Sequence, residues 1–290
     1  MQRGEYAFMN ALLEQIKYAN GKFPEEQIRQ IISRKEEFIP ELIEILRSAE
    51  DNYNEILGKP NYFLHIYAAY LLAQFNEEQS FSLIIDLISL PDEIVFKIFG
   101  DVVTEDLHRI LASVCKGNVQ PVKELLENEN VNEYIRVAAI KTFPVLWVEG
   151  VISKDEIIKY YRSLLKEKLK RERSVVWGSL VSSCCEICPD ELYEEIKEAY
   201  KDNLIENFYI SLEEVEENFD IEDDERILNL KRRGYEFIRD TIKDLEYWPC
   251  FQQNIKSEPQ NGTHIQRKIA DKKKKKRKQV KASRKNQRRK

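Results

Sequence analysis

The stretch Tyr134-Ile-Arg-Val-Ala-Ala-Ile-Lys-Thr-Phe-Pro-Val-Leu146 decides the fold prediction. Its apolar residues recur at helical spacing and flank a pair of small residues, Ala138 and Ala139. Two further stretches share the pattern, at 63–75 and 174–182, with the small pairs Ala68-Ala69 and Gly178-Ser179. Small side chains let a neighbouring helix approach closely, and a second amphipathic segment follows each stretch. Units of this kind bury a core only by stacking, so we predict an all-α array of stacked helical hairpins.

The segment Tyr134 to Leu146 resembles the first helix of a HEAT repeat, including Arg136 before the alanine pair. The three related stretches are irregularly spaced, so the resemblance implies a HEAT-like α-α superhelix and not a regular HEAT array. Pro144 lies inside its helix and should kink it, because proline removes one backbone hydrogen bond.

Helical periodicity extends over most of the first 203 residues, and strand alternation is almost absent. Apolar stripes at 6–16, 28–32 and 42–49 indicate three helices before a break at Gly58-Lys59-Pro60. Ser153 and Glu156 form a capping box that marks one helix start. Further helices are predicted at 62–75, 79–89, 92–99, 105–115, 119–126, 132–148, 154–169, 174–188 and 190–203.

Charge divides the chain into two parts. Residues 256–290 contain 16 Lys or Arg and two acids, whereas residues 1–255 contain 30 bases and 49 acids. The net charge of −5 therefore combines an acidic body of about −19 with a basic tail of about +14. We predict a helical domain at 1–255 and a disordered tail at 256–290, because the tail has no apolar periodicity and repels itself.

The tail carries the candidate binding residues. They are Lys272, Lys273, Lys274, Lys275, Lys276, Arg277, Lys278, Lys281, Arg284, Lys285, Arg288, Arg289 and Lys290. Without aromatic residues the tail cannot stack on bases, which leaves salt-dependent contact with the phosphate backbone of RNA or DNA. A nuclear localisation signal and a merely solubilising tail are the alternatives. Membrane binding is not expected, because no amphipathic or lipidated element accompanies the charge.

The run Glu213 to Glu225 holds nine acids in thirteen residues. It lacks the glycine and the terminal glutamate of a calcium-binding loop, so a solvated loop or helix start is the default interpretation. A sharper hypothesis is that it receives the basic tail of the same chain and competes with an external polyanion.

Five cysteines are too few and too unevenly placed for a secreted disulfide framework, so we expect a reducing, cytoplasmic compartment. No apolar run of signal-peptide length follows Met1. Cys184-Cys185-Glu-Ile-Cys188 contains a Cys-x-x-Cys motif, but no matching ligands complete a zinc site. We predict that these cysteines are buried in the core.

Three histidines are present, and two have a plausible chemical role to weigh. His65 is expected to be a hydrogen-bonded core residue. His108 follows Thr104, Glu105 and Asp106, which with Asp101 suggest an acid/base or metal site. The favoured interpretation is instead a helix start capped by Thr104, with the two acids in its first turn.

A closer resemblance rests on three consecutive stretches: Gly100-Asp-Val-Val-Thr-Glu-Asp-Leu-His-Arg-Ile-Leu-Ala-Ser-Val114, Gly117-Asn-Val-Gln-Pro-Val-Lys-Glu-Leu-Leu-Glu-Asn128 and Asn132-Glu-Tyr-Ile-Arg-Val-Ala-Ala139. Together they are similar to a bacterial family of helical proteins of unknown function, found in chlamydiae and cyanobacteria. The resemblance covers roughly Asn10 to Phe251. Many relatives end in a zinc-binding motif like that of the SecA translocation ATPase. Here no Cys-x-Cys follows Phe251, so the resemblance implies neither a cofactor nor a metal for this chain.

These observations favour a non-enzymatic protein-binding scaffold whose tail adds nonspecific nucleic-acid affinity. The expected partners are an unknown protein on the concave face of the array and RNA or DNA phosphates on the tail. The alternative is a nucleic-acid-processing enzyme resembling the HEAT-like DNA glycosylases, with Trp147 and Trp177 imitating a base-binding cleft. The acidic body argues against the alternative, because a duplex needs a basic cleft.

Overall fold

The computed structural model describes residues 3–205 and 209–252. In these ranges the regular structure is helical, apart from one isolated antiparallel bridge between Tyr18 and Tyr62. This confirms the predicted all-α, repeat-like fold. The predicted tail and its boundary at residue 255 lie outside the described residues.

The first half of the array comprises nine helices. They are α1 (Arg3–Ile16), α2 (Glu25–Ser33), α3 (Lys35–Asp51), α4 (Tyr53–Leu57), α5 (Leu64–Phe75), α6 (Ser80–Ile88), α7 (Asp92–Phe99), α8 (Val102–Glu105) and α9 (Leu107–Val114). The remainder comprises α10 (Gln120–Glu127), α11 (Glu133–Val148), α12 (Lys154–Ser163), the π-helix η1 (Leu164–Lys168), α13 (Val175–Ile187), α14 (Tyr193–Lys201), α15 (Leu212–Glu216), α16 (Asp223–Arg232), α17 (Thr241–Leu245) and the 3₁₀ turn η2 (Pro249–Phe251).

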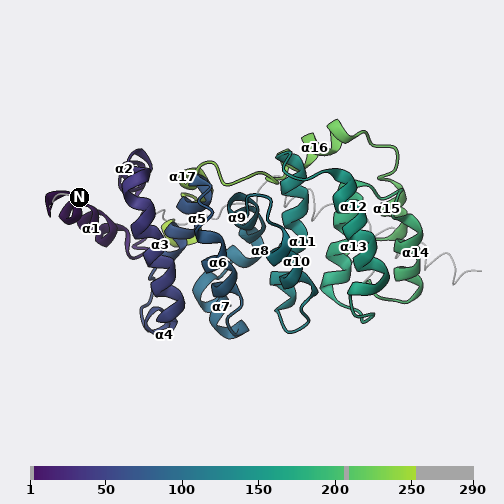
Figure 1. Cartoon of the computed structure of the whole chain (residues 1–290), viewed down its shortest axis with the longest axis horizontal. Helices are drawn as coiled ribbons and strands as arrows, with labels where there is room; N and C mark the ends of the chain where they lie inside the picture. Colours follow the sequence, from purple (N-terminus) through teal and green to yellow (C-terminus); the bar gives the residue numbers. More distant parts are fainter. Residues whose placement is uncertain (1–2, 206–208, 253–290) are drawn as a thin grey trace, which may run out of the picture. The chain divides into compact units, whose positions relative to one another are not determined.

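The helices form two layers (Figure 1). Helices α3, α5, α9, α11 and α13 pack on one another in succession. Helices α6, α10 and α12 form the second layer, each against a member of the first. Each unit thus contacts its neighbours in sequence, as in a helical repeat protein.

Burial explains which helices are central. Ten of the twelve residues of α5 and twelve of the sixteen residues of α11 are buried, because both helices are apolar on nearly all sides. By contrast, α10 buries only Val122, Leu125 and Leu126 and exposes a polar face. The sequence stretches that decided the fold prediction therefore form α5, α11 and α13 of the first layer. We call this layer, α3, α5, α9, α11 and α13, the inner layer.

Pro144 lies within α11, and the helix continues through it to Val148. Proline cannot donate a hydrogen bond to the carbonyl of Ile140, four residues earlier. The hydroxyl of Tyr161 on α12 donates to that oxygen instead, at 2.9 Å. A side chain of the neighbouring layer thus satisfies the carbonyl that proline leaves without its helical partner.

The small residues have two different uses. Ala68, Ala69, Ala138 and Ala139 are buried between helices, as predicted. At Gly178 the prediction of a closely packed helix is wrong. The ring of Tyr209 occupies that place, and a Cβ on Gly178 would lie 2.8 Å from its Cγ.

Two predicted helices differ from the observed ones. The helix predicted at 105–115 begins only at Leu107 as α9, and Glu105 instead ends the separate short helix α8, with Asp106 between the two. The predicted helix 154–169 ends as an α-helix at Ser163 and continues as the π-helix η1. No helix in the described parts of the chain is both long and apolar enough to cross a bilayer.

Candidate functional site: the return segment and the charged surfaces

The most unusual feature is a segment at residues 233–251, here called the return segment, which follows α16 and crosses α11, α9 and α5 (Figure 1). Side chains of the array hold its main chain. Glu149, Ser113 and Gln74 accept hydrogen bonds from the amides of Phe237, Ile238 and Thr241, at 3.0, 2.9 and 2.8 Å respectively. The inner helices therefore bind an extended stretch of their own chain.

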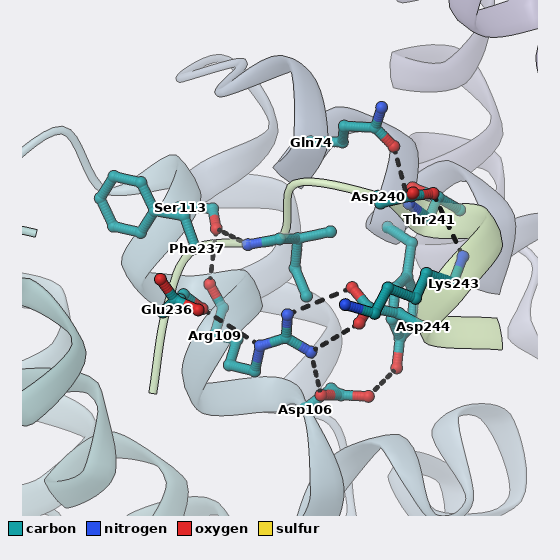
Figure 2. A network of polar contacts seen from close by, with 12 residues as sticks. Gln74, Asp106, Arg109, Ser113, Glu236, Phe237, Asp240, Thr241, Lys243 and Asp244 are labelled. Atoms are coloured by element: carbon teal, nitrogen blue, oxygen red, sulfur yellow. Dashed lines mark hydrogen bonds and ion pairs between the residues drawn. The ribbon is translucent and has the colours of Figure 1, made fainter. Parts of the chain in front are cut away.

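Arg109 on α9 is the centre of this attachment (Figure 2). Its guanidinium donates to the carbonyl of Glu236 at 3.1 Å and to both carboxylate oxygens of Asp244 at 3.2 Å. It also donates to Asp106 at 2.7 Å, and Asp106 accepts from Tyr70 on α5 at 2.6 Å. Burial raises the pKa of Asp244, an effect that the neighbouring arginine partly offsets. One arginine thus joins α5, α9 and the return segment.

Aromatic side chains fix the far end of the return segment. The ring of Phe251 packs edge-on against Phe23 and Phe63, each with a centroid separation of 5.2 Å. Trp248 packs against Phe63 and Tyr70 at 6.1 and 6.2 Å. Phe251 is buried, so the return segment ends inside the core beside α2 and α5.

The predicted cap at Thr104 is wrong. Thr104 lies inside α8, and its hydroxyl donates to the carbonyl of Asp101 at 3.2 Å. Asp106 precedes α9 without capping it, because its carboxylate binds Arg109 and Tyr70. The cluster suspected of acid/base chemistry is therefore divided among separate structural contacts.

Both histidines of the helical domain are buried. His65 bonds the carbonyl of Ile98 through Nε2 at 2.8 Å, which confirms the predicted core role. The ring of His108 packs against Tyr235 of the return segment, 5.3 Å between centroids. Burial lowers the pKa of His65 to about 4 and that of His108 to about 3. Both imidazoles are therefore neutral near pH 7.

The predicted burial of the cysteines is confirmed. Cys184, Cys185 and Cys188 lie in the core at the end of α13, and burial raises the pKa of each thiol. In residues 3–205 and 209–252 no cluster of three or more His, Cys, Asp or Glu side chains could hold a metal ion.

The acidic run at residues 213–225 covers α15 and the start of α16, and its nine carboxylates are exposed, as expected of a solvated segment. Arg226 holds this segment to the core. It is only 5% exposed and donates to the carbonyls of Asn218, Ile221 and Cys185 at 2.6, 2.9 and 2.7 Å. The acidic surface thus lies over a buried arginine that donates to three carbonyl oxygens.

The tryptophans of the proposed base-binding cleft are both buried. Trp177 donates to the carbonyl of Lys170 at 2.9 Å and lines a pocket of about 210 Å³ together with Arg136, Arg173 and Glu129. Trp147 does not line that pocket. The two tryptophans therefore do not meet in this pocket.

None of the thirteen predicted tail residues, from Lys272 to Lys290, lies among the described residues. The structure therefore leaves their role in nucleic-acid binding as a prediction. The return segment, in contrast, was missed. The apolar residues Tyr235, Ile238 and Ile242, which are buried and follow a polar helix, are the signal that could have found it.

The described array matches a known family model. The family described as "Protein of unknown function (DUF1186)" matches residues 8–252. The chain belongs to this family. Members from Chlamydia trachomatis and Chlamydia muridarum, both described as uncharacterized proteins, are each 38% identical to it over 237 residues. That alignment covers 82% of this chain and 94% and 95% of theirs, respectively. No solved structure matches the chain.

The extent of the match has a structural meaning. The family model ends at residue 252, so it includes the return segment and leaves out residues 253–290. The array together with its return segment is therefore the family domain, and the basic residues lie beyond it.

Proposed function

We propose that this family member is a non-enzymatic, cytoplasmic protein-binding scaffold built on a HEAT-like array, with a basic tail that adds nonspecific affinity for RNA or DNA. The succession of inner helices α3, α5, α9, α11 and α13 supports the HEAT-like arrangement, because each packs on the next.

The separation of charge is the observation that carries the proposal. A body of about −19 does not attract a polyanion, whereas a tail of about +14 does. The exposure of the nine acids at residues 213–225 adds to the repulsion of nucleic acid from the body. Nucleic acid is thus assigned to the tail, and a different kind of partner to the array.

The polar side chains of the body make structural contacts, which supports a non-enzymatic scaffold role. Asp106 and Asp244 both bind Arg109, and His65 and His108 are buried and neutral. These groups hold the fold together. Neither histidine combines the exposure and the pKa near neutrality that suit general acid–base catalysis.

The return segment restricts where a protein partner binds. It occupies the side of α5, α9 and α11 that carries Gln74, Ser113 and Glu149. A partner therefore contacts other surfaces of the array, such as the interhelical loops around Tyr134, which is 42% exposed.

Site-specific photo-crosslinking in the native cell tests the scaffold role. A photoreactive residue at Tyr134 should capture a protein, and the capture should survive nuclease treatment and replacement of the thirteen candidate binding residues of the tail by glutamine. Placing the same residue at Tyr6 on α1 gives a matched exposed control. Loss of all captured protein with nuclease or with the neutral tail would contradict the proposal.

A further inference from the structure

A pocket of about 410 Å³ lies where two interhelical loops meet. One wall is the end of α6 with the loop to α7, and the other is α10 with the loop to α11. We call it the loop pocket, and its lining includes Ile88, Leu125, Val131, Asp92, Glu124 and Asn130. Its volume falls within the range of ligand-binding pockets.

The interior of the loop pocket is apolar, and its rim is acidic. Ile88 and Leu125 are buried and form apolar walls, whereas Asp92, Glu124 and Asn130 are exposed at the rim. The thirteen lining residues include two carboxylates, three asparagines and no lysine or arginine. The pocket therefore combines an apolar interior with a negative opening.

Both rim carboxylates lack a cationic partner among the described residues. Asp92 accepts one hydrogen bond, from the side-chain amide of Asn132 at 2.8 Å, and Glu124 accepts one from the side-chain amide of Gln120 at 2.9 Å. Asn132 is oriented by its own cap of α11, because its side-chain oxygen accepts from the amide of Tyr134 at 2.9 Å. Each carboxylate thus keeps an oxygen available for a ligand.

We propose that the loop pocket binds an arginine side chain from an extended segment of a partner protein. The aliphatic stem of arginine suits the walls at Ile88 and Leu125, and its charged head suits the carboxylates of Asp92 and Glu124. This inference rests on the proposed scaffold function and specifies its partner as a basic peptide segment.

The choice of a partner protein follows from charge complementarity. An acidic rim on an acidic body attracts a basic segment, and the guanidinium forms paired hydrogen bonds with a carboxylate. An apolar side chain would fill the interior but would leave the carboxylates of Asp92 and Glu124 without a cationic partner.

Titration of the full-length chain with three blocked tripeptides tests the inference. Ac-Gly-Arg-Gly-NH2, its citrulline analogue and its leucine analogue are compared by nuclear magnetic resonance, which follows the Asn130 and Asn132 side-chain amides. Citrulline has the shape of arginine without its charge. We expect the arginine peptide to bind roughly tenfold more tightly than the other two, because only it pairs with the rim charges.

Variants locate the effect. Asp92→Asn with Glu124→Gln should remove most of the preference for arginine, while keeping an acceptor for Asn132. Asp101→Asn with Glu105→Gln changes the same number of exposed charges elsewhere and should leave the preference intact. Equal binding of the leucine peptide, or a preference unaffected by the rim variant, would overturn the inference.

A variant of the tail tests which segment occupies the pocket. If replacing Lys272–Lys278 by glutamine strengthens peptide binding severalfold, the tail competes for the pocket and assignment to a partner protein is wrong.

Two further outcomes separate this inference from the proposed function. If the peptides fail to bind while photo-crosslinking at Tyr134 still captures a protein, only the loop-pocket inference fails. Peptide binding without capture would instead remove the scaffold function.

Discussion

At the scale of single residues, the buried histidines make stability depend on pH. The pKa values of about 4 for His65 and about 3 for His108 lie below the ordinary value of 6.5, because burial penalises the charged imidazole. As the pH falls below 6.5, the unfolded chain binds protons before the folded chain does. Stability is therefore present above pH 6.5 and is lost progressively below it.

We predict that lowering the pH from 7.5 to 5.0 reduces the free energy of unfolding by about 2 kcal/mol for each histidine. Urea unfolding at intervals across this range measures the effect. His108→Phe, which keeps a ring beside Tyr235, should remove about half of the slope. The raised pKa values of Glu186 and Asp244 act in the opposite direction as the pH falls, so the contribution of His108 is read from the difference between the wild-type chain and His108→Phe. A flat profile would contradict the neutral, buried state of both rings.

Arg226 gives a second prediction at this scale. Its guanidinium joins the carbonyl of Cys185 in α13 to those of Asn218 and Ile221 in the connection between α15 and α16, which a lysine ammonium cannot span. We predict that Arg226→Leu lowers the free energy of unfolding by about 3 kcal/mol or more, and that Arg226→Lys restores little of it. Arg29→Leu, which breaks only an exposed ion pair with Glu25, should cost less than about 1 kcal/mol. Equal effects of the two leucine variants would contradict the anchoring role.

At the scale of the helices, Pro144 and Tyr161 form a coupled pair. Tyr161→Phe leaves the buried carbonyl of Ile140 without a donor and should cost about 1–3 kcal/mol. Pro144→Ala supplies a backbone amide for the same oxygen, so the cost of Tyr161→Phe should fall in that background. Chemical denaturation of the four variants of this cycle measures the coupling. Additive effects would show that the hydroxyl does not replace the missing backbone bond.

Local patterns explain how much of the architecture could be predicted. The periodicity of the apolar residues places α5, α7, α11 and α13 to within about two residues, because each helix buries a continuous stripe. The break at Asp106 could not be predicted, since it depends on Arg109 and Asp244, a residue far away in the sequence. The return segment escaped for the same reason. Its main chain is held by side chains of distant helices, and its apolar residues do not follow a regular period along the whole segment.

The same reasoning applies to the candidate sites. The burial of Cys184 and Cys188 follows from their positions on an apolar stripe and was predicted. The loop pocket was not, because it arises where the loops after α6 and α10 meet. Sequence patterns describe one helix face at a time, whereas this site depends on how two hairpins are placed.

At the scale of the whole molecule, we expect the two opposite charges to set the behaviour of the chain toward polyanions. If the acidic run receives the tail of the same chain, neutralising exposed acids in it should strengthen RNA binding. We predict a severalfold gain, largest at low salt, for the amide variants of Glu217, Asp220, Glu222, Asp224 and Glu225. Glu214 and Glu216 are left intact because they bind Ser211 and Tyr193.

A matched control distinguishes docking of the tail from a general loss of negative charge. It neutralises five exposed acids outside the run, Asp51, Glu78, Glu93, Asp101 and Glu105. Filter binding to one RNA at several salt concentrations compares the two sets. Equal gains in both sets would remove the hypothesis that the acidic run competes for the tail.

The most direct test of the account is a comparison of the full-length chain with a 1–255 truncation in binding RNA and duplex DNA across a salt series. We predict that only the full-length chain binds, and that its affinity falls steeply with salt as phosphate contacts release counterions, by about 0.7–0.9 logarithmic units per contact for each tenfold rise in salt. Comparable binding by the truncation would place a nucleic-acid site on the acidic array. That result would contradict the assignment of nucleic acid to the tail and of protein partners to the array.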